Sequence, residues 1–96
     1  MISRDGDRML ISGPVTLQNV TAQLEDGLAQ VRTGALTVDL AGVTELDSSL
    51  LAAILAWIRE ARREKNSLMI ENLPEGLQTL AQLYGVEQLL PMANRI

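Results

Sequence analysis

The chain has 96 residues and a net charge of −4 at pH 7, and it contains neither cysteine nor histidine. These two absences exclude disulfides, thiolate catalysis, Ser-His nucleophilic machinery and the usual zinc ligands, so we expect no enzyme activity, no metal and no bound cofactor. The acidic charge, with Trp57 and Tyr84 as the only aromatic residues, argues against a nucleic-acid partner, which requires basic patches and stacking surfaces.

The length predicts one small domain over residues 1–96, and the sequence gives no sign of membrane insertion. The N-terminal segment MISRDGDRML carries charges where a signal peptide has an apolar core. The longest apolar run, Leu50 to Ile58, is about half the length of a transmembrane helix. We therefore expect a cytosolic protein that has a protein partner and no direct contact with lipid.

The first third of the chain predicts a β-hairpin followed by an amphipathic helix. The segment Ser3–Arg8 contains Asp5-Gly6, a pair that favours a type I′ turn, and the apolar segment RMLISG after it predicts a strand that ends at Gly13-Pro14. Apolar residues then recur at spacings of three and four, on one face of a helix. These residues are Leu17, Val20, Leu24, Leu28 and Val31. We expect Gly34 to end this helix.

The rest of the chain alternates strands and helices. The expected order is a strand over 35–40, a loop at 41–42, a helix that continues through residue 65, a strand over 67–71 and a helix over 75–84. Pro74 is placed to start the last helix and Gly85 to end it. Strand-helix-strand units form parallel pairs and the hairpin adds an antiparallel pair. The predicted fold is therefore α/β, with a mixed sheet of about four strands packed by about three helices.

An acid and two hydroxyls, Asp47-Ser48-Ser49, stand directly in front of the apolar run of the second helix. One interpretation is a helix N-cap, in which the side chain of Asp47 or Ser48 accepts hydrogen bonds from the first turn. A cap needs only one side chain, however, and a helix N-terminus also favours an anion or a phosphoryl group. The segment is therefore the first candidate for a functional site.

The strand VDLAGV, followed by Asp47-Ser48-Ser49 at the start of a helix, resembles the STAS domain family, which includes the bacterial anti-sigma factor antagonists. In those antagonists the pattern is Asp-Ser-Ser-Gly or Asp-Ser-Thr-Gly, and the resemblance implies that Ser49 is the candidate phosphorylation site. Leu50 stands where the antagonists have glycine, which makes the surface beside Ser49 bulkier.

The C-terminal segment QTLAQLYGVEQLLP is most similar to the STAS subunits of Mla phospholipid ABC transporters, the MlaB-like proteins. This resemblance implies a non-catalytic subunit that binds and stabilises or regulates the cytoplasmic ATPase of a Gram-negative transporter maintaining outer-membrane lipid asymmetry. The implied assembly includes a permease and a periplasmic lipid-binding subunit and holds the chain at the inner membrane. Ser48 is the implied docking residue. An anti-sigma factor antagonist, switched by phosphorylation at Ser49, remains the alternative function.

The second helix also contains candidate contact residues. Leu51, Ile54, Leu55 and Ile58 have the spacing of a core face. A neighbouring stripe contains Leu50, Ala53 and Trp57, and if exposed it would form a docking surface, because tryptophan is enriched in interface hot spots. The candidate partner-binding residues are therefore Asp47, Ser48, Ser49, Leu50 and Trp57.

The cationic residues Arg59, Arg62, Arg63 and Lys65 suit a solvated helix end. Asp39 is a further candidate for the polar rim around Asp47.

Overall fold

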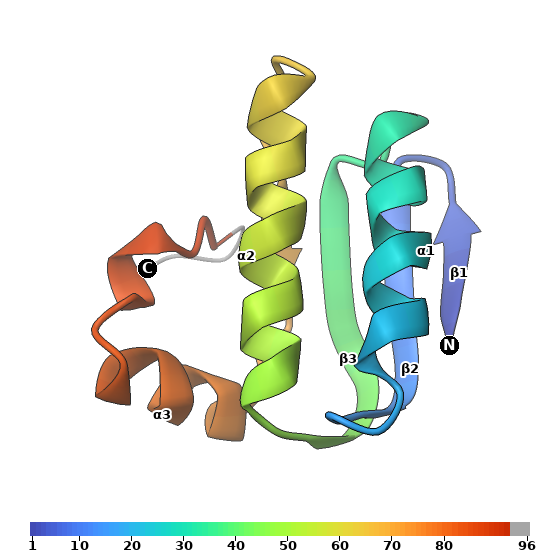
Figure 1. Ribbon diagram of the computed structural model, residues 1–96. Coiled ribbons are helices and arrows are strands. Elements are labelled where there is room, and N and C mark those ends of the chain that lie inside the picture. The colour runs from blue at the N-terminus through green and yellow to red at the C-terminus, as the bar shows by residue number, and fades with distance from the viewer. Residues whose placement is uncertain (93–96) are drawn as a thin grey trace.

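The computed structural model describes residues 1–92, which form a mixed sheet in the order β1-β2-β3-β4 (Figure 1). The elements are β1 (Ile2–Asp5), β2 (Arg8–Val15), α1 (Val20–Arg32), β3 (Thr37–Leu46), α2 (Ser48–Arg63), β4 (Met69–Glu71), α3 (Glu75–Leu83) and the short 3-10 helix η1 (Glu87–Leu89). Strand β1 pairs antiparallel with β2, whereas the β2-β3 and β3-β4 pairs are parallel. The predicted α/β fold with a four-stranded mixed sheet and three helices is confirmed.

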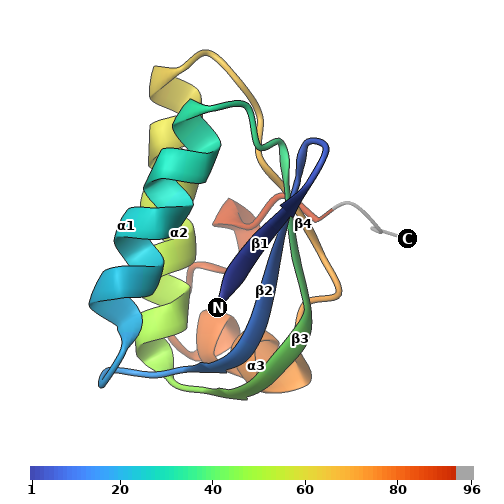
Figure 2. The same cartoon turned by 90° about the vertical axis from the view of Figure 1, so that its right-hand side faces the viewer.

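Helices α1 and α2 lie side by side on one face of the sheet, and α3 lies next to α2 (Figures 1 and 2). The core forms where inward residues of the strands, such as Met9, Val38 and Ile70, pack among inward residues of the helices, such as Val31 and Ile54. Among the helices of residues 1–92, none combines the length and the apolarity needed to cross a bilayer.

The strands β2 and β3 are longer than predicted, because they pair with each other through the glycine segments that were expected to end them. A register shift between Gly13 and Pro14 allows β2 to continue to Val15. The expected loop at Ala41-Gly42 is likewise part of β3. A Cβ atom at Gly42 would lie 2.9 Å from the Ile11 carbonyl oxygen, so glycine permits the close approach of the two strands.

The hairpin turn between β1 and β2 consists of Gly6-Asp7 and not of Asp5-Gly6, because Asp5 pairs with Arg8. Of the two turn residues, only Gly6 has a positive φ, +63°. A type I′ turn requires a positive φ at both central residues, so the predicted type I′ turn is wrong although the hairpin itself is confirmed.

Helix α1 begins at Val20, and Leu17 precedes it in a turn. The side chain of Asn19 stabilises this turn: its Oδ1 accepts from the Thr16 amide at 3.0 Å and its Nδ2 donates to the Pro14 carbonyl at 2.9 Å. The expected place of Leu17 on the apolar stripe of this helix is therefore wrong, and Leu17 is 77% exposed. Gly34 ends the helix as predicted, with φ at +109°.

Candidate partner-docking site

Asp47 caps α2 and connects it to the turn before α1. Its Oδ1 accepts hydrogen bonds from the Ser49 amide, at 2.9 Å, and from the Ser49 hydroxyl, while its Oδ2 accepts from the Leu17 amide at 2.9 Å. The predicted N-cap is therefore confirmed for Asp47. One carboxylate thus holds together two segments that are 30 residues apart in the sequence.

These hydrogen bonds lower the pKa of the Asp47 carboxyl below its ordinary value. The largest cause is the Ser49 hydroxyl, followed by the amides of Leu17 and Ser49, and desolvation opposes them. Each of these donors favours the charged form of the carboxyl group. Asp47 is consequently ionised at neutral pH and is a weak proton acceptor.

The two serines at the start of α2 differ in accessibility. Ser48 is exposed, and within residues 1–92 its hydroxyl forms no hydrogen bond, whereas Ser49 is half-buried and donates its hydroxyl proton to Asp47. A phosphate on Ser49 would break that bond and place further negative charge beside a carboxylate. The accessible hydroxyl of the pair therefore belongs to Ser48.

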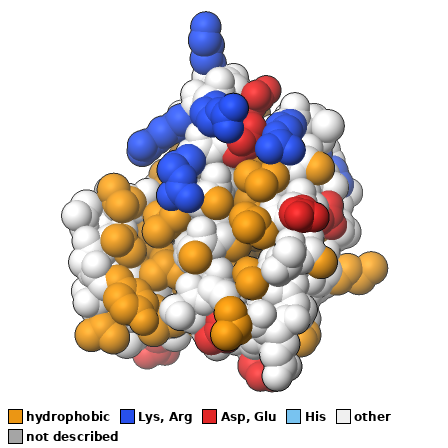
Figure 3. Space-filling view, in the orientation of Figure 1, with side chains coloured by type: hydrophobic (Ala, Val, Ile, Leu, Met, Phe, Trp, Pro, Cys, Tyr) orange, Lys and Arg blue, Asp and Glu red, His pale blue; other side chains and the backbone are white. Residues whose placement is uncertain are grey.

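A groove of about 580 Å³ runs between α1 and α2 and has Asp47, Ser48 and Ser49 at one end. We call it the α1–α2 groove. It is lined by Leu17, Val20, Leu24, Asp47, Ser48, Ser49, Ala52, Ala53, Ala56 and Arg59. Apolar side chains gather over the helices on this face of the molecule, and Lys and Arg side chains cluster near the C-terminal end of α2 (Figure 3). The groove thus combines an apolar lining with polar groups from the N-terminus of α2 and from Arg59.

Two candidate contact residues lie in the core and not on the surface. Leu50 and Trp57 are both 0% exposed, so the condition for the predicted docking stripe is not met. The Trp57 indole packs against Gly27 of α1, where an added Cβ atom would lie 2.2 Å from Cε2, and Nε1 donates to the Leu24 carbonyl at 3.0 Å. Because both residues are fully buried, neither side chain reaches a partner in this conformation. Ala53, which is 2% exposed, still contributes to the groove lining.

Asp39 does not share a rim with Asp47, because it belongs to a separate polar cluster on the sheet. Arg8 forms ion pairs with Asp39, at 2.7 Å, and with Glu71, while Asn72 donates to Asp39 at 2.9 Å. Partial burial raises the pKa of Asp39, but hydrogen bonds from Asn72, the Ala41 amide and Arg8 outweigh it and lower the pKa overall. The carboxylate is therefore satisfied within the fold.

Sequence reasoning missed several residues of the groove. Leu17 was assigned to the apolar stripe of a helix and Arg59 to a solvated helix end, and both line the groove. Val20 and Leu24 were assigned to the same apolar stripe, and in the structure they are partly buried and line the groove. Local spacing places residues on the same face of one helix, but it does not identify the residues that border a gap between two helices.

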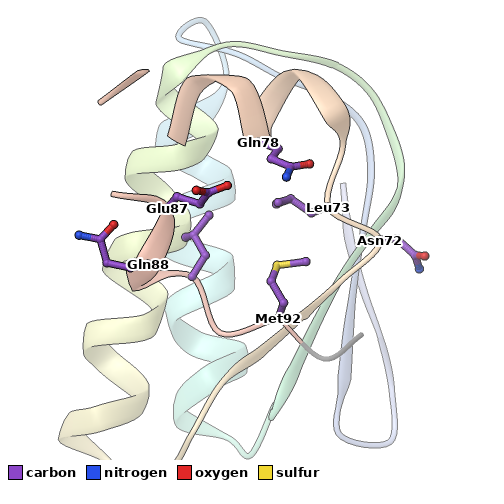
Figure 4. A pocket seen from close by; sticks show the side chains of 7 residues that line it. Asn72, Leu73, Gln78, Glu87, Gln88 and Met92 are labelled. Atoms are coloured by element: carbon purple, nitrogen blue, oxygen red, sulfur yellow. The ribbon is translucent and has the colours of Figure 1, made fainter. Parts of the chain in front are cut away.

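A second cavity, of about 550 Å³, lies beside α3 and η1 and contains none of the predicted site residues. Leu73, Gln78 and Met92 point toward a common space there, whereas Asn72 points away (Figure 4). Its charged lining residue is Glu87, so it offers no cation to a phosphate group. In the described part of the chain, no three metal-ligating side chains come together as a cation site.

Known proteins resemble this chain in both sequence and fold. Residues 2–91 match the sequence profile of the family described as "Mlab, STAS domain". The intermembrane phospholipid transport system binding protein MlaB of Escherichia coli K12 is 28% identical over 81 residues, which are 84% of this chain and 82% of the relative.

Two solved structures have the same fold. A chain of the Acinetobacter MlaFEDB complex in its ATP-bound Vtrans2 conformation superposes with a TM-score of 0.84 at 23% identity, covering 97% of this chain and 99% of the other. The unphosphorylated anti-sigma factor antagonist SpoIIAA superposes with a TM-score of 0.68 at 14% identity, covering 100% and 88%. At these identities the two likenesses establish the fold alone.

Proposed function

The chain belongs to the MlaB STAS domain family, and from this premise we propose that it is the STAS subunit of an ABC-type phospholipid transporter. In this proposal the subunit docks on the cytoplasmic ATPase of the transporter and stabilises or regulates it. The names of its relatives, a phospholipid transport system binding protein and an ATP-bound MlaFEDB complex, support this assignment. The chain would then lie at the cytoplasmic side of the inner membrane, held there by a complex with a permease and a periplasmic lipid-binding subunit.

The observation that carries the docking proposal is the composition of the α1–α2 groove. Its centre is apolar and contains three alanines, which allow another chain to approach the helix backbone closely. Its edge carries groups with no partner of their own, since within residues 1–92 the Ser48 hydroxyl forms no hydrogen bond and Arg59 forms no ion pair. An apolar centre with a polar rim is the usual anatomy of a protein interface.

The same site supports a binding function and not a catalytic one. A serine nucleophile requires an adjacent base that accepts its proton. The carboxylate next to the serines, Asp47, already accepts hydrogen bonds from Leu17 and Ser49, and its pKa is lowered. We therefore propose that ATP and lipid are handled by the partner subunits.

Substitution of Ser48 tests the proposal, because Ser48→Arg places a long cation at the groove where a partner must exclude water. We expect Ser48→Arg to melt near wild type and to lose about tenfold or more in affinity for the ATPase subunit, measured by co-purification and calorimetric titration. Ser67→Arg is the matched control, since Ser67 is also exposed and lies outside the α1–α2 groove. Normal binding by Ser48→Arg would contradict docking through this groove.

An anti-sigma factor antagonist is the alternative function, and the fold likeness to SpoIIAA supports it. That function requires a phosphorylated hydroxyl, whereas the Ser49 hydroxyl is engaged by Asp47. Mass spectrometry of the same co-purified sample separates the two functions. Stoichiometric phosphate on Ser49, together with a sigma-factor kinase in place of the ATPase, would favour the antagonist.

A further inference from the structure

We propose that Leu17 is an anchor of the docking surface and that Asp47 is the positioning residue that holds Leu17 in place. This inference rests on the proposed function, because it concerns how the α1–α2 groove receives the ATPase subunit. It assigns Asp47 an indirect role, in which its carboxylate organises the surface without contacting the partner.

Leu17 is a large apolar residue held outside the core. Its side chain is 77% exposed and lies at the groove beside the half-buried Val20 and Leu24, so the three leucine and valine side chains form one apolar border. Isolated exposed leucines are common on protein surfaces. This leucine differs because it borders a groove and because hydrogen bonds from Asn19 and Asp47 fix the turn that carries it.

The turn that carries Leu17 is fixed on one side by Asn19 and on the other by Asp47. Asn19 bonds to the backbone of Thr16 and Pro14, and Asp47 accepts the Leu17 amide at 2.9 Å. Because Asp47 binds the backbone of Leu17, the leucine side chain remains free to face a partner. A preorganised anchor loses less conformational entropy on binding.

The two oxygens of Asp47 have separate tasks, and this makes a selective substitution available. Oδ1 caps α2 through Ser49, and Oδ2 holds Leu17. An asparagine has one acceptor oxygen, and its amide nitrogen is a donor. Asparagine is itself a favoured N-cap residue, so Asp47→Asn should keep the cap on α2 through its oxygen and lose the acceptor for the Leu17 amide.

The groove also indicates the chemistry of the segment that enters it. From Ser48 to Arg59 the lining extends along α2 by about 16 Å, or three helical turns, at the usual rise per residue. Its lining is apolar, and the cationic Arg59 has no ion-pair partner within residues 1–92. By charge complementarity, the fitting segment of the ATPase subunit has an apolar face against the alanines and a carboxylate opposite Arg59.

A double-mutant cycle tests whether Asp47 acts through Leu17. The affinity of the purified ATPase subunit is measured for wild type, Leu17→Ala, Asp47→Asn and the double variant, each with its melting temperature. We expect each single variant to bind about tenfold more weakly or worse, and the double variant to bind within about threefold of Leu17→Ala. Leu17→Met should retain near-normal binding, since it keeps an apolar side chain. Leu83→Ala is the matched control, because Leu83 is 74% exposed on α3, away from the groove.

The outcomes separate this inference from the proposed function. If Leu17→Ala binds normally while Ser48→Arg does not bind, the anchor is refuted and the docking site stands. If the effects of Leu17→Ala and Asp47→Asn multiply in the double variant, Asp47 is a helix cap without a positioning role. If Leu17→Ala and Ser48→Arg both bind normally, docking through the groove itself is wrong. Leu17→Ala truncates an exposed side chain, so its result does not depend on a loss of folding.

Discussion

Helices α1 and α2 are in tight contact around Trp57, whereas the α1–α2 groove leaves a gap between them. We call these two regions the closed contact and the groove. At the closed contact the indole packs against Gly27 and donates to the Leu24 carbonyl, with no part of it exposed. At the groove, alanines of α2 leave about 580 Å³ unfilled between the same two helices. A large side chain opposite a glycine joins the helices, and small side chains a few residues away keep a surface available. Stability and the proposed docking therefore depend on different residues of one helix pair.

The largest expected effect comes from filling the closed contact. Gly27→Ala should destabilise the domain by roughly 1–3 kcal/mol, because the new methyl group would overlap the Trp57 ring. The steric cost of the overlap should exceed the gain of about 1 kcal/mol that alanine has over glycine in a helix, so the net effect is destabilising. Urea unfolding measures the change.

Gly76→Ala is the matched control for Gly27→Ala. Its added Cβ atom would have only Leu46 Cδ1 nearby, at 3.9 Å, so we expect unchanged or slightly higher stability. Equal effects of the two substitutions would show that the Trp57 contact does not join the helices as described.

At the α1–α2 groove, Asp47 should make the free energy of unfolding depend on pH. Its folded pKa is lowered, so its contribution to stability is complete above the unfolded value of 3.8 and is lost as the pH falls through the folded pKa. Wild type should therefore exceed Asp47→Asn in unfolding free energy at neutral pH, and this difference should shrink as the pH falls below 3.8. Urea unfolding of both proteins across this range is the measurement. A difference that does not change with pH would show that the charge of Asp47 is unimportant to the cap.

The smallest expected effect lies at the end of α2, outside both regions. Lys65 follows the C-cap with a φ of +61°, a conformation that favours glycine. Lys65→Gly should stabilise the domain by about 0.5–1 kcal/mol and leave ATPase docking unchanged. Lys65→Ala is the control, since it removes the charge and keeps the Cβ atom. An equal gain from alanine would assign the effect to the side chain and not to the backbone.

Local patterns in the sequence were sufficient for the order of elements and for the helix ends other than the start of α1. The Asp47 cap, the start of α3 after Pro74 and the positive φ at Gly34 and Gly85 agree with the prediction. Each of these features depends on hydrogen bonds or backbone angles within about five residues. The resemblance to the STAS family likewise rested on contiguous residues, and the family profile over residues 2–91 confirms it.

Only the tertiary structure decided which residues of the two helices are accessible. Trp57 was expected at an interface and is buried, because Gly27, 30 residues earlier, provides space for its ring. Leu17 was expected on the apolar face of a helix and lies exposed in a turn, because Asp47 and Asn19 hold that turn outside α1. The periodicity of a helix specifies which residues share a face, whereas burial of that face depends on the residues of another element that pack against it. The α1–α2 groove exists only between two elements, so no single stretch of the sequence could predict it.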